Sequence, residues 1–180
     1  MEVVKVPLER LSSILGARRE TKKLIEEKAN VELNVKDDGD VEINGEGADI
    51  FFAKDVIKAI GRGFQPKHAL LLLNDGYNLQ IINLKEICRN DNDTKRVKSR
   101  VIGEDGKVKT IIEDATESYI SVYGNTISII SKFDTMETAK EAVYKLIDGA
   151  PHSPVFSFLS KAKRRIMGER LRSSSPRKGE

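Results

Sequence analysis

The sequence predicts an α+β protein that contains two tandem copies of one βααββα unit, each a small three-stranded sheet packed by helices, with the two copies closely docked. Two observations lead to this expectation. The same order of strand and helix patterns occurs in the first 63 residues and again after residue 78. Residue identities also repeat, because an offset of 87 places Gly16 on Gly103 and Ile25 on Ile112. Further matches are Lys22 with Lys109 and, at an offset of 86, Ala53 with Ala139 and Gly63 with Gly149.

The first unit, residues 1–63, follows from changes in hydrophobic spacing. Apolar residues that alternate with polar ones indicate a half-buried strand, as at Val31, Leu33 and Val35, whereas apolar residues three or four apart indicate a helix. Asp37-Asp-Gly39 is typical of a turn. In order, we expect a strand at 3–6, helices at 8–15 and 18–29, strands at 31–35 and 41–43, and a helix at 48–60.

The second unit, residues 79–150, repeats that order. We expect a strand at 79–82, helices at 94–102 and 107–114, strands at 119–123 and 126–131 that Gly124-Asn125 separates, and a helix at 135–147. Residues 64–78 join the units and contain the apolar run Ala69–Leu73. We predict an apolar connecting helix there that packs the two units together.

Composition favours a folded chain, with 39% hydrophobic and 33% charged residues. No apolar run approaches the length of roughly 20 residues that is needed to cross a bilayer, and no secretory pattern follows Met1. We therefore expect a cytoplasmic protein without a membrane partner. Cys88 is the only cysteine, which excludes an intrachain disulfide.

Positive charge is concentrated at the end of the chain. Residues 161–180 contain eight Lys or Arg and two acids, a net charge of +6, so the other 160 residues carry −3 of the total of +3. We interpret residues 151–180 as a basic C-terminal extension that can neutralise RNA phosphates, or that merely keeps the chain soluble. Removal of residues 161–180 is expected to weaken RNA binding and to leave the folded body intact. Lys163, Arg164 and Arg165 are the candidate contacts.

The tetrad Gly103-Glu-Asp-Gly106 lies between the two helices predicted at 94–102 and 107–114. Glycines there allow positive φ and let the backbone approach a nucleic-acid strand closely. The free N–H groups at the start of the next helix favour a phosphate. A GxxG is a weak motif alone, but this one occurs at the helix–helix junction of a βααββα unit.

The residues from Arg100 to Lys107, with Ile111–Glu113, Ile120–Val122 and Ile127–Ile130, resemble a type I KH domain, in which about four single-stranded nucleotides are clamped beside the GxxG turn. The run Ser99–Pro151, the degenerate unit before it, and Ile60-Gly-Arg-Gly-Phe64 resemble the ribosome-assembly KH proteins known as partner of the Nob endonuclease. Archaeal members contain two KH units and a basic C-terminal extension, so the resemblance covers nearly the whole chain.

That resemblance implies RNA binding near the 3′ end of small-subunit rRNA and presentation of the precursor to the Nob-type endonuclease. It also implies association with the α-subunit of initiation factor two. By the same resemblance, the glycines of the turn provide close backbone approach, basic residues contact phosphates, and isoleucines line the groove. These residues are Gly103 and Gly106, then Arg100, Lys107 and Lys109, then Ile102, Ile111 and Ile120.

Some residues depart from the family pattern. Glu104 and Asp105 place acids where phosphate should pass, so a purely structural turn stays an alternative. In the first unit the matching tetrad is Gly16-Ala-Arg-Arg19, which lacks the second glycine. Its basic cluster, which includes Arg18, Arg19 and Lys22, is either a secondary RNA contact or a solvated helix face.

Catalysis is not expected. His68 and His152 are isolated, and the sequence has no metal-ligand spacing, phosphate-binding loop or nucleophile motif. We therefore predict no catalytic residue, no metal and no cofactor. Two alternatives to ribosome assembly stay open: a KH-type regulator of translation or RNA decay, and a protein-docking adaptor that binds no RNA.

Overall fold

The computed structural model describes residues 1–174, so the end of the predicted extension, with Arg177 and Lys178, lies outside the described residues. The chain divides into two compact units. One is formed by residues 1–87 and 119–130, and the other by residues 88–118 and the residues from 131 onward. This division differs from the sequence repeat, whose boundaries remain a prediction.

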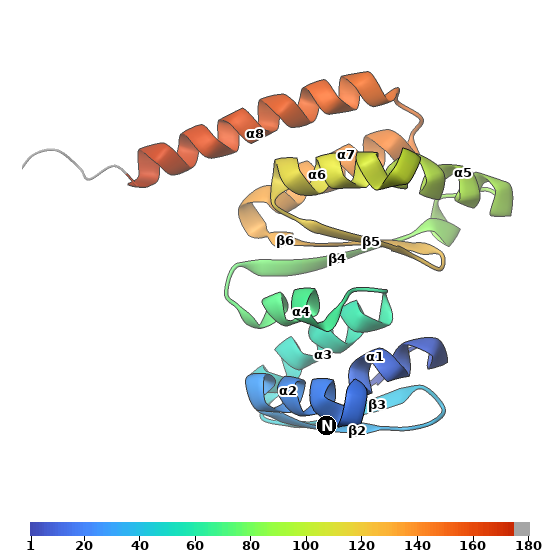
Figure 1. Cartoon of the computed structure of the whole chain (residues 1–180), viewed down its shortest axis with the longest axis vertical. Helices are drawn as coiled ribbons and strands as arrows, with labels where there is room; N and C mark the ends of the chain where they lie inside the picture. Colours follow the sequence, from blue (N-terminus) through green and yellow to red (C-terminus); the bar gives the residue numbers. More distant parts are fainter. Residues whose placement is uncertain (175–180) are drawn as a thin grey trace, which may run out of the picture. The chain divides into compact units, whose positions relative to one another are not determined.

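The first sheet joins β1 (Glu2–Lys5), β2 (Val31–Val35) and β3 (Asp40–Gly45) in the antiparallel order β1-β3-β2. Leu33 is paired with Ile43, and both are buried because strand residues alternate between the two faces. α2 (Glu20–Ala29) and α3 (Gly47–Gly61) cover that face, and α1 (Leu11–Leu15) packs against both helices (Figure 1). The core therefore lies between this sheet and its helices.

The predicted connector forms the short helix α4 (Pro66–Ala69) and the 3-10 turn η3 (Leu70–Leu73). Pro66 is the first residue of α4, a position that needs no backbone N–H donor. Both segments pack against α3, and Ala69 and Leu72 are buried in the core of the first unit.

A second antiparallel sheet has the order β4-β6-β5, with β4 at Tyr77–Asn83, β5 at Tyr119–Tyr123 and β6 at Thr126–Lys132. Tyr119 is paired with Ile130 and Ile120 with Ile129. Ile130 lies in the core of the first unit, against which Leu79 and Tyr119 are partly buried.

The second unit consists mainly of helices. α7 (Phe133–Ile147) packs on α5 (Asp91–Ile102) and on α6 (Lys107–Thr116). Asn90 starts α5, since its side chain accepts a hydrogen bond from the Asp93 N–H at 2.9 Å. With two three-stranded antiparallel sheets packed by helices, the predicted α+β fold is confirmed.

The second unit ends in α8 (His152–Ser174), a helix that the sequence analysis did not predict. It packs on α6 and α7 (Figure 1). Its contact face is an apolar stripe of buried residues at helical spacing: Val155, Leu159, Ala162 and Ile166. The described part of the extension is therefore a packed element, and removal of residues 161–180 would take Ala162 and Ile166 out of this stripe.

Candidate nucleic-acid interface

The GxxG turn links α5 to α6 through a short 3-10 turn at Glu104–Gly106. Gly103 ends α5 with φ 73° and ψ 178°, and its N–H donates to Ser99 O at 2.8 Å. Asp105 and Gly106 follow with φ 50° and φ 76°. Three of the four turn residues thus have left-handed φ values, the region that glycine tolerates best.

The two glycines have different surroundings. A Cβ on Gly103 would lie 2.3 Å from the Val108 Cγ2 atom, so the folded turn itself excludes a larger residue. Outside Gly106 and its adjoining backbone, a Cβ on Gly106 would meet no atom of the described residues within 4 Å. Packing therefore explains Gly103, whereas Gly106 leaves an open backbone face that a ligand can approach.

α6 begins directly after Gly106, and no side chain among residues 1–174 caps its first N–H groups. Those donors and the helix dipole favour an anion at this end. Lys107 is exposed and forms no ion pair within the described chain. The predicted phosphate contacts at the turn and the start of α6 are thus physically accessible.

The other predicted phosphate contacts already have partners within the protein. Lys109 Nζ lies 3.1 Å from Glu113 Oε1, one turn along α6. The Arg100 guanidinium donates to Leu146 O at 3.1 Å and also to Ala150 O, and so holds the end of α7. This geometry favours a structural role for Arg100, and the phosphate contact of Arg100 stays a prediction.

The predicted groove residues differ in exposure. Ile111 is 36% exposed and Ile102 is half-buried, so both present apolar surface. Ile120, in β5, is only 4% exposed, which leaves little of its side chain for a base to contact.

The first-unit turn has nearly the same backbone as the GxxG turn. Gly16 has φ 70° and ψ 175°, and Arg18 has φ 50°, close to the values of Gly103 and Asp105. A Cβ on Gly16 would clash with Thr21 at 2.2 Å, as one on Gly103 would with Val108. The loss of the second glycine has therefore not changed the shape of the turn.

Basic side chains at this first turn are exposed. Arg18 and Arg19 form no ion pair with any residue that the structure describes, whereas Lys22 Nζ lies 2.8 Å from Glu26 Oε1. The Lys22–Glu26 pair corresponds, at the offset of 87, to Lys109–Glu113. The two arginines are thus the available cations of this cluster.

Most basic residues of α8 are exposed, away from its buried stripe. Lys163, Arg164 and Arg165 are all in this group. Farther along, Arg170 binds Glu117 at 2.5 Å and Asp134 at 3.4 Å. The hydrogen bond from Arg170 lowers the pKa of Glu117 below its ordinary value.

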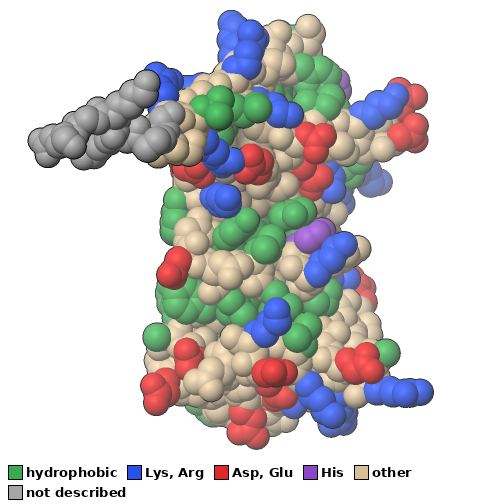
Figure 2. Space-filling view, turned by 60° about the vertical axis from the view of Figure 1, so that its left-hand side comes forward, with side chains coloured by type: hydrophobic (Ala, Val, Ile, Leu, Met, Phe, Trp, Pro, Cys, Tyr) green, Lys and Arg blue, Asp and Glu red, His purple; other side chains and the backbone are tan. Residues whose placement is uncertain are grey.

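Acidic and basic side chains are interspersed over the face of the molecule in Figure 2. This mixture fits the small net charge of −3 on residues 1–160. Within residues 1–160, attraction for RNA therefore has to come from local groups, such as a helix end or a few unpaired cations, rather than from a broad basic surface.

The sequence analysis missed one polar hollow in the first unit. Arg62, Lys85 and Asn125 line it, and they come from three distant segments that carry no shared motif. Only the folded chain brings them together. The sequence offers no signal for such a site.

Residues 1–174 contain no group of three or more His, Cys, Asp or Glu side chains placed to hold a metal ion. No helix among these residues is long and apolar enough to cross a membrane.

Comparison with family models gives a match over residues 78–164 to the second KH domain of PNO1, described as a eukaryotic-type KH domain, KH-domain type I. A KH domain-containing protein of Methanocaldococcus jannaschii is 37% identical over 176 residues, which cover 95% of this chain and 78% of that protein. The pre-rRNA-processing protein pno1 of Aspergillus fumigatus is 29% identical over 116 residues, and this match spans only 46% of the fungal protein.

Solved structures of archaeal proteins are also similar to this chain. Dim2p from Pyrococcus horikoshii superimposes with a TM-score of 0.83 and 37% identity, over 89% of this chain and 98% of that one. A chain of the a/eIF2alpha–aDim2p–rRNA complex from the same organism gives a TM-score of 0.84 and 36% identity, over 91% and 94% of the two chains.

Proposed function

The chain belongs to the PNO1/Dim2 family of KH-domain proteins, and from that premise we propose that it is a single-stranded RNA-binding factor of ribosome assembly that acts near the 3′ end of small-subunit rRNA. Family membership confirms the resemblance drawn from the residues around Gly103. The relatives support a role in ribosome assembly, because the fungal protein is a pre-rRNA-processing protein and the archaeal Dim2p occurs in a complex with rRNA.

The observation that carries this proposal is the open backbone at Gly106. Outside Gly106 and its adjoining backbone, no atom of the described residues lies within 4 Å of the position that a Cβ would take, and the uncapped start of α6 follows directly. A phosphodiester placed there meets N–H donors, the positive end of the helix dipole and the exposed Lys107. Gly103 shapes the turn, and Ile102 and Ile111 offer apolar surface to the bases.

Two partners extend the proposal. We assign the α-subunit of initiation factor two as a partner because the archaeal Dim2p forms a complex with a/eIF2alpha and rRNA. Presentation of the rRNA precursor to a Nob-type endonuclease rests on the family resemblance alone. In this proposal the Nob-type endonuclease cleaves the RNA, and the GxxG turn of this chain binds and orients the RNA without supplying a reacting group.

The test uses the purified chain and three RNAs of equal length: the 3′-terminal sequence of the small-subunit rRNA, a scrambled single strand, and the rRNA sequence paired to its complement. We expect the single-stranded rRNA sequence to bind most tightly at physiological salt. Equal affinity for the scrambled strand would favour a general KH-type regulator. Absence of binding to all three RNAs would favour the protein-docking adaptor and reject the proposal.

A further inference from the structure

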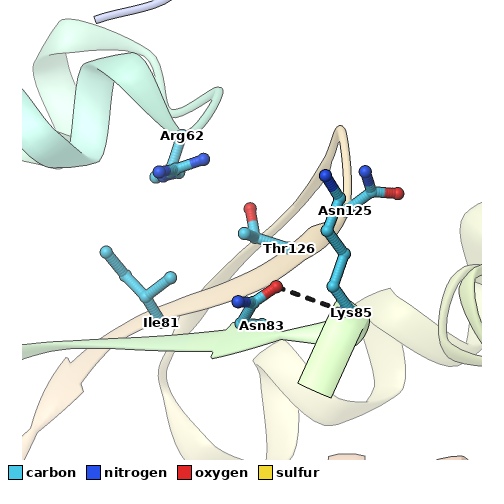
Figure 3. A pocket seen from close by; sticks show the side chains of 6 residues that line it. All are labelled: Arg62, Ile81, Asn83, Lys85, Asn125 and Thr126. Carbon is cyan, nitrogen blue, oxygen red and sulfur yellow. Dashed lines mark hydrogen bonds between the residues drawn. The ribbon is translucent and has the colours of Figure 1, made fainter. Parts of the chain in front are cut away.

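A polar hollow of about 400 Å³ lies in the first compact unit, apart from the residues assigned to the GxxG turn. Its volume falls in the range of roughly 300–1,000 Å³ that is usual for ligand sites. Figure 3 shows the six side chains around it. They come from the end of α3, from β4 and the turn after it, and from the β5–β6 hairpin: Arg62, Ile81, Asn83, Lys85, Asn125 and Thr126.

The chain itself holds this hollow open. The Leu84 N–H donates to Asn125 O at 2.8 Å, which ties the end of β4 to the hairpin. The Ser121 hydroxyl donates to Arg62 O at 2.7 Å, which ties the end of α3 to β5. Because both bonds use backbone carbonyls, the Arg62 and Asn125 side chains stay available.

The charged side chains that line the hollow, Arg62 and Lys85, are both cationic. Arg62 and Lys85 form no ion pair with any of residues 1–174, although most lysines near them do: Lys54 pairs with Glu2 and Lys58 with Asp55. In Figure 3 the two cationic side chains approach the hollow from different sides. Glu86, an acid close in the sequence, does not line the hollow, and its carboxylate accepts a hydrogen bond from the Asn83 amide at 2.9 Å.

The available donors match one ligand chemistry. A guanidinium, an ammonium and the Asn125 amide face the hollow, while the Asn83 oxygen and the Thr126 hydroxyl already bond to backbone groups. Arg presents two parallel donors to a phosphate, and Lys adds a point charge. Two unpaired cations around a hollow without an acid favour an anion with several acceptor oxygens.

We propose that this hollow binds a backbone phosphate of single-stranded RNA, as a second RNA contact separate from the GxxG turn. The assignment rests on the proposed function, in which RNA is the polyanion that the protein binds. A second hollow of about 300 Å³ shares Arg62 and Ile81 with the first and has Lys5, Lys54 and Lys58 in its wall. Arg62 therefore lines both hollows, and the three lysines of the second hollow are each paired with an acid.

The experiment follows two local signals in the full-length 15N-labelled protein by NMR while a 12-nucleotide single strand of the 3′-terminal small-subunit rRNA sequence is added. One signal is the Asn125 side-chain amide, and the other is the Gly106 backbone N–H. We expect both to shift in the wild type. In the Arg62→Gln/Lys85→Gln variant we expect the Asn125 shift to disappear, the Gly106 shift to persist, and RNA affinity to fall about tenfold.

A matched control removes the same charge elsewhere in the first unit. Lys28 and Lys67 are exposed and have no ion pair in the described chain, so Lys28→Gln/Lys67→Gln should leave RNA affinity within about twofold of the wild type. If this control loses as much affinity as the Arg62/Lys85 variant, the hollow has no special part and the inference fails. A folded amide spectrum for both variants excludes unfolding as the cause.

Three other outcomes separate this inference from the proposed function. If RNA shifts Gly106 and leaves Asn125 unmoved at saturation, the second contact is rejected while the GxxG contact stands. If neither signal moves, both fail. If inorganic phosphate shifts Asn125 and RNA does not, the hollow is a site for small anions, and the RNA assignment is overturned.

Discussion

Arg19 has the same left-handed backbone conformation as Gly106, with φ 63° and ψ 23° against φ 76° and ψ 10°. Each residue directly precedes a helix, and each donates its N–H to a glycine carbonyl three residues earlier at 3.3 Å. The two turns therefore differ in side chains and not in backbone. This pair of residues allows the contribution of an open backbone face to be separated from that of charge.

Changing Gly106 to Asp should reduce binding of single-stranded rRNA by more than tenfold, because a side chain and a third acid would occupy the open face beside Glu104 and Asp105. Arg19→Asp in the matching position should reduce affinity by only about two- to threefold, since a charge contact is largely nonspecific. Binding curves at fixed salt, with circular dichroism of both variants, measure this asymmetry. Equal losses from two folded variants would mean that both turns grip RNA.

Changing Arg19 to Gly should raise the free energy of unfolding by roughly 1 kcal/mol, because a non-glycine residue in the left-handed region carries a steric cost of about that size. Gly103→Ala should act in the opposite direction, since the new Cβ would overlap Val108. Urea denaturation of the three proteins tests both signs. A neutral Gly103→Ala would show that the turn adjusts easily and that packing does not fix this glycine.

Removing the charges of α8 should separate RNA binding from stability. The triple variant Lys163→Gln, Arg164→Gln and Arg165→Gln keeps the buried stripe, so the unfolding midpoint should stay unchanged while the slope of log affinity against log salt becomes shallower. A chain that ends at residue 160 loses Ala162 and Ile166 and should be destabilised. An unchanged salt slope in the triple variant would exclude phosphate contacts from this helix.

The Glu117–Arg170 pair should add a small pH dependence to stability. Arg170 lowers the folded-state pKa of Glu117, so the stabilisation is present above the unfolded-state pKa of about 4.3 and is lost as the pH falls through the folded value. Because both side chains are more than a third exposed, we expect only a few tenths of a kcal/mol. The stability difference between wild type and Glu117→Gln should therefore shrink between pH 7 and pH 3. A constant difference would contradict the assignment.

Local patterns were sufficient to predict most elements. The strand predicted at 119–123 matches β5, and the helix predicted from residue 107 begins where α6 begins. Glycines at 16 and 103 marked the helix–helix junctions because no other residue fits those positions. The fold of the βααββα units was thus encoded in short-range spacing.

Two features of the structure were not predicted, for different reasons. Residues 161–172 were interpreted only as a basic segment, although Val155, Leu159, Ala162 and Ile166 have the spacing of a packed helix. That signal was present in the sequence and was missed. In contrast, the free cations Arg62 and Lys85 could not be told from their paired neighbours, because pairing depends on contacts between segments far apart in the chain.

The first compact unit is closed by residues 119–130, which are separated from the rest of that unit by 31 residues of the other. β4 pairs with β6, which is made only when the ribosome reaches residues 126–132. During synthesis the first 87 residues thus emerge with β4 as an unpaired edge and without Ile130 in their core. Completion of the first compact unit must therefore wait until the ribosome has translated part of the second.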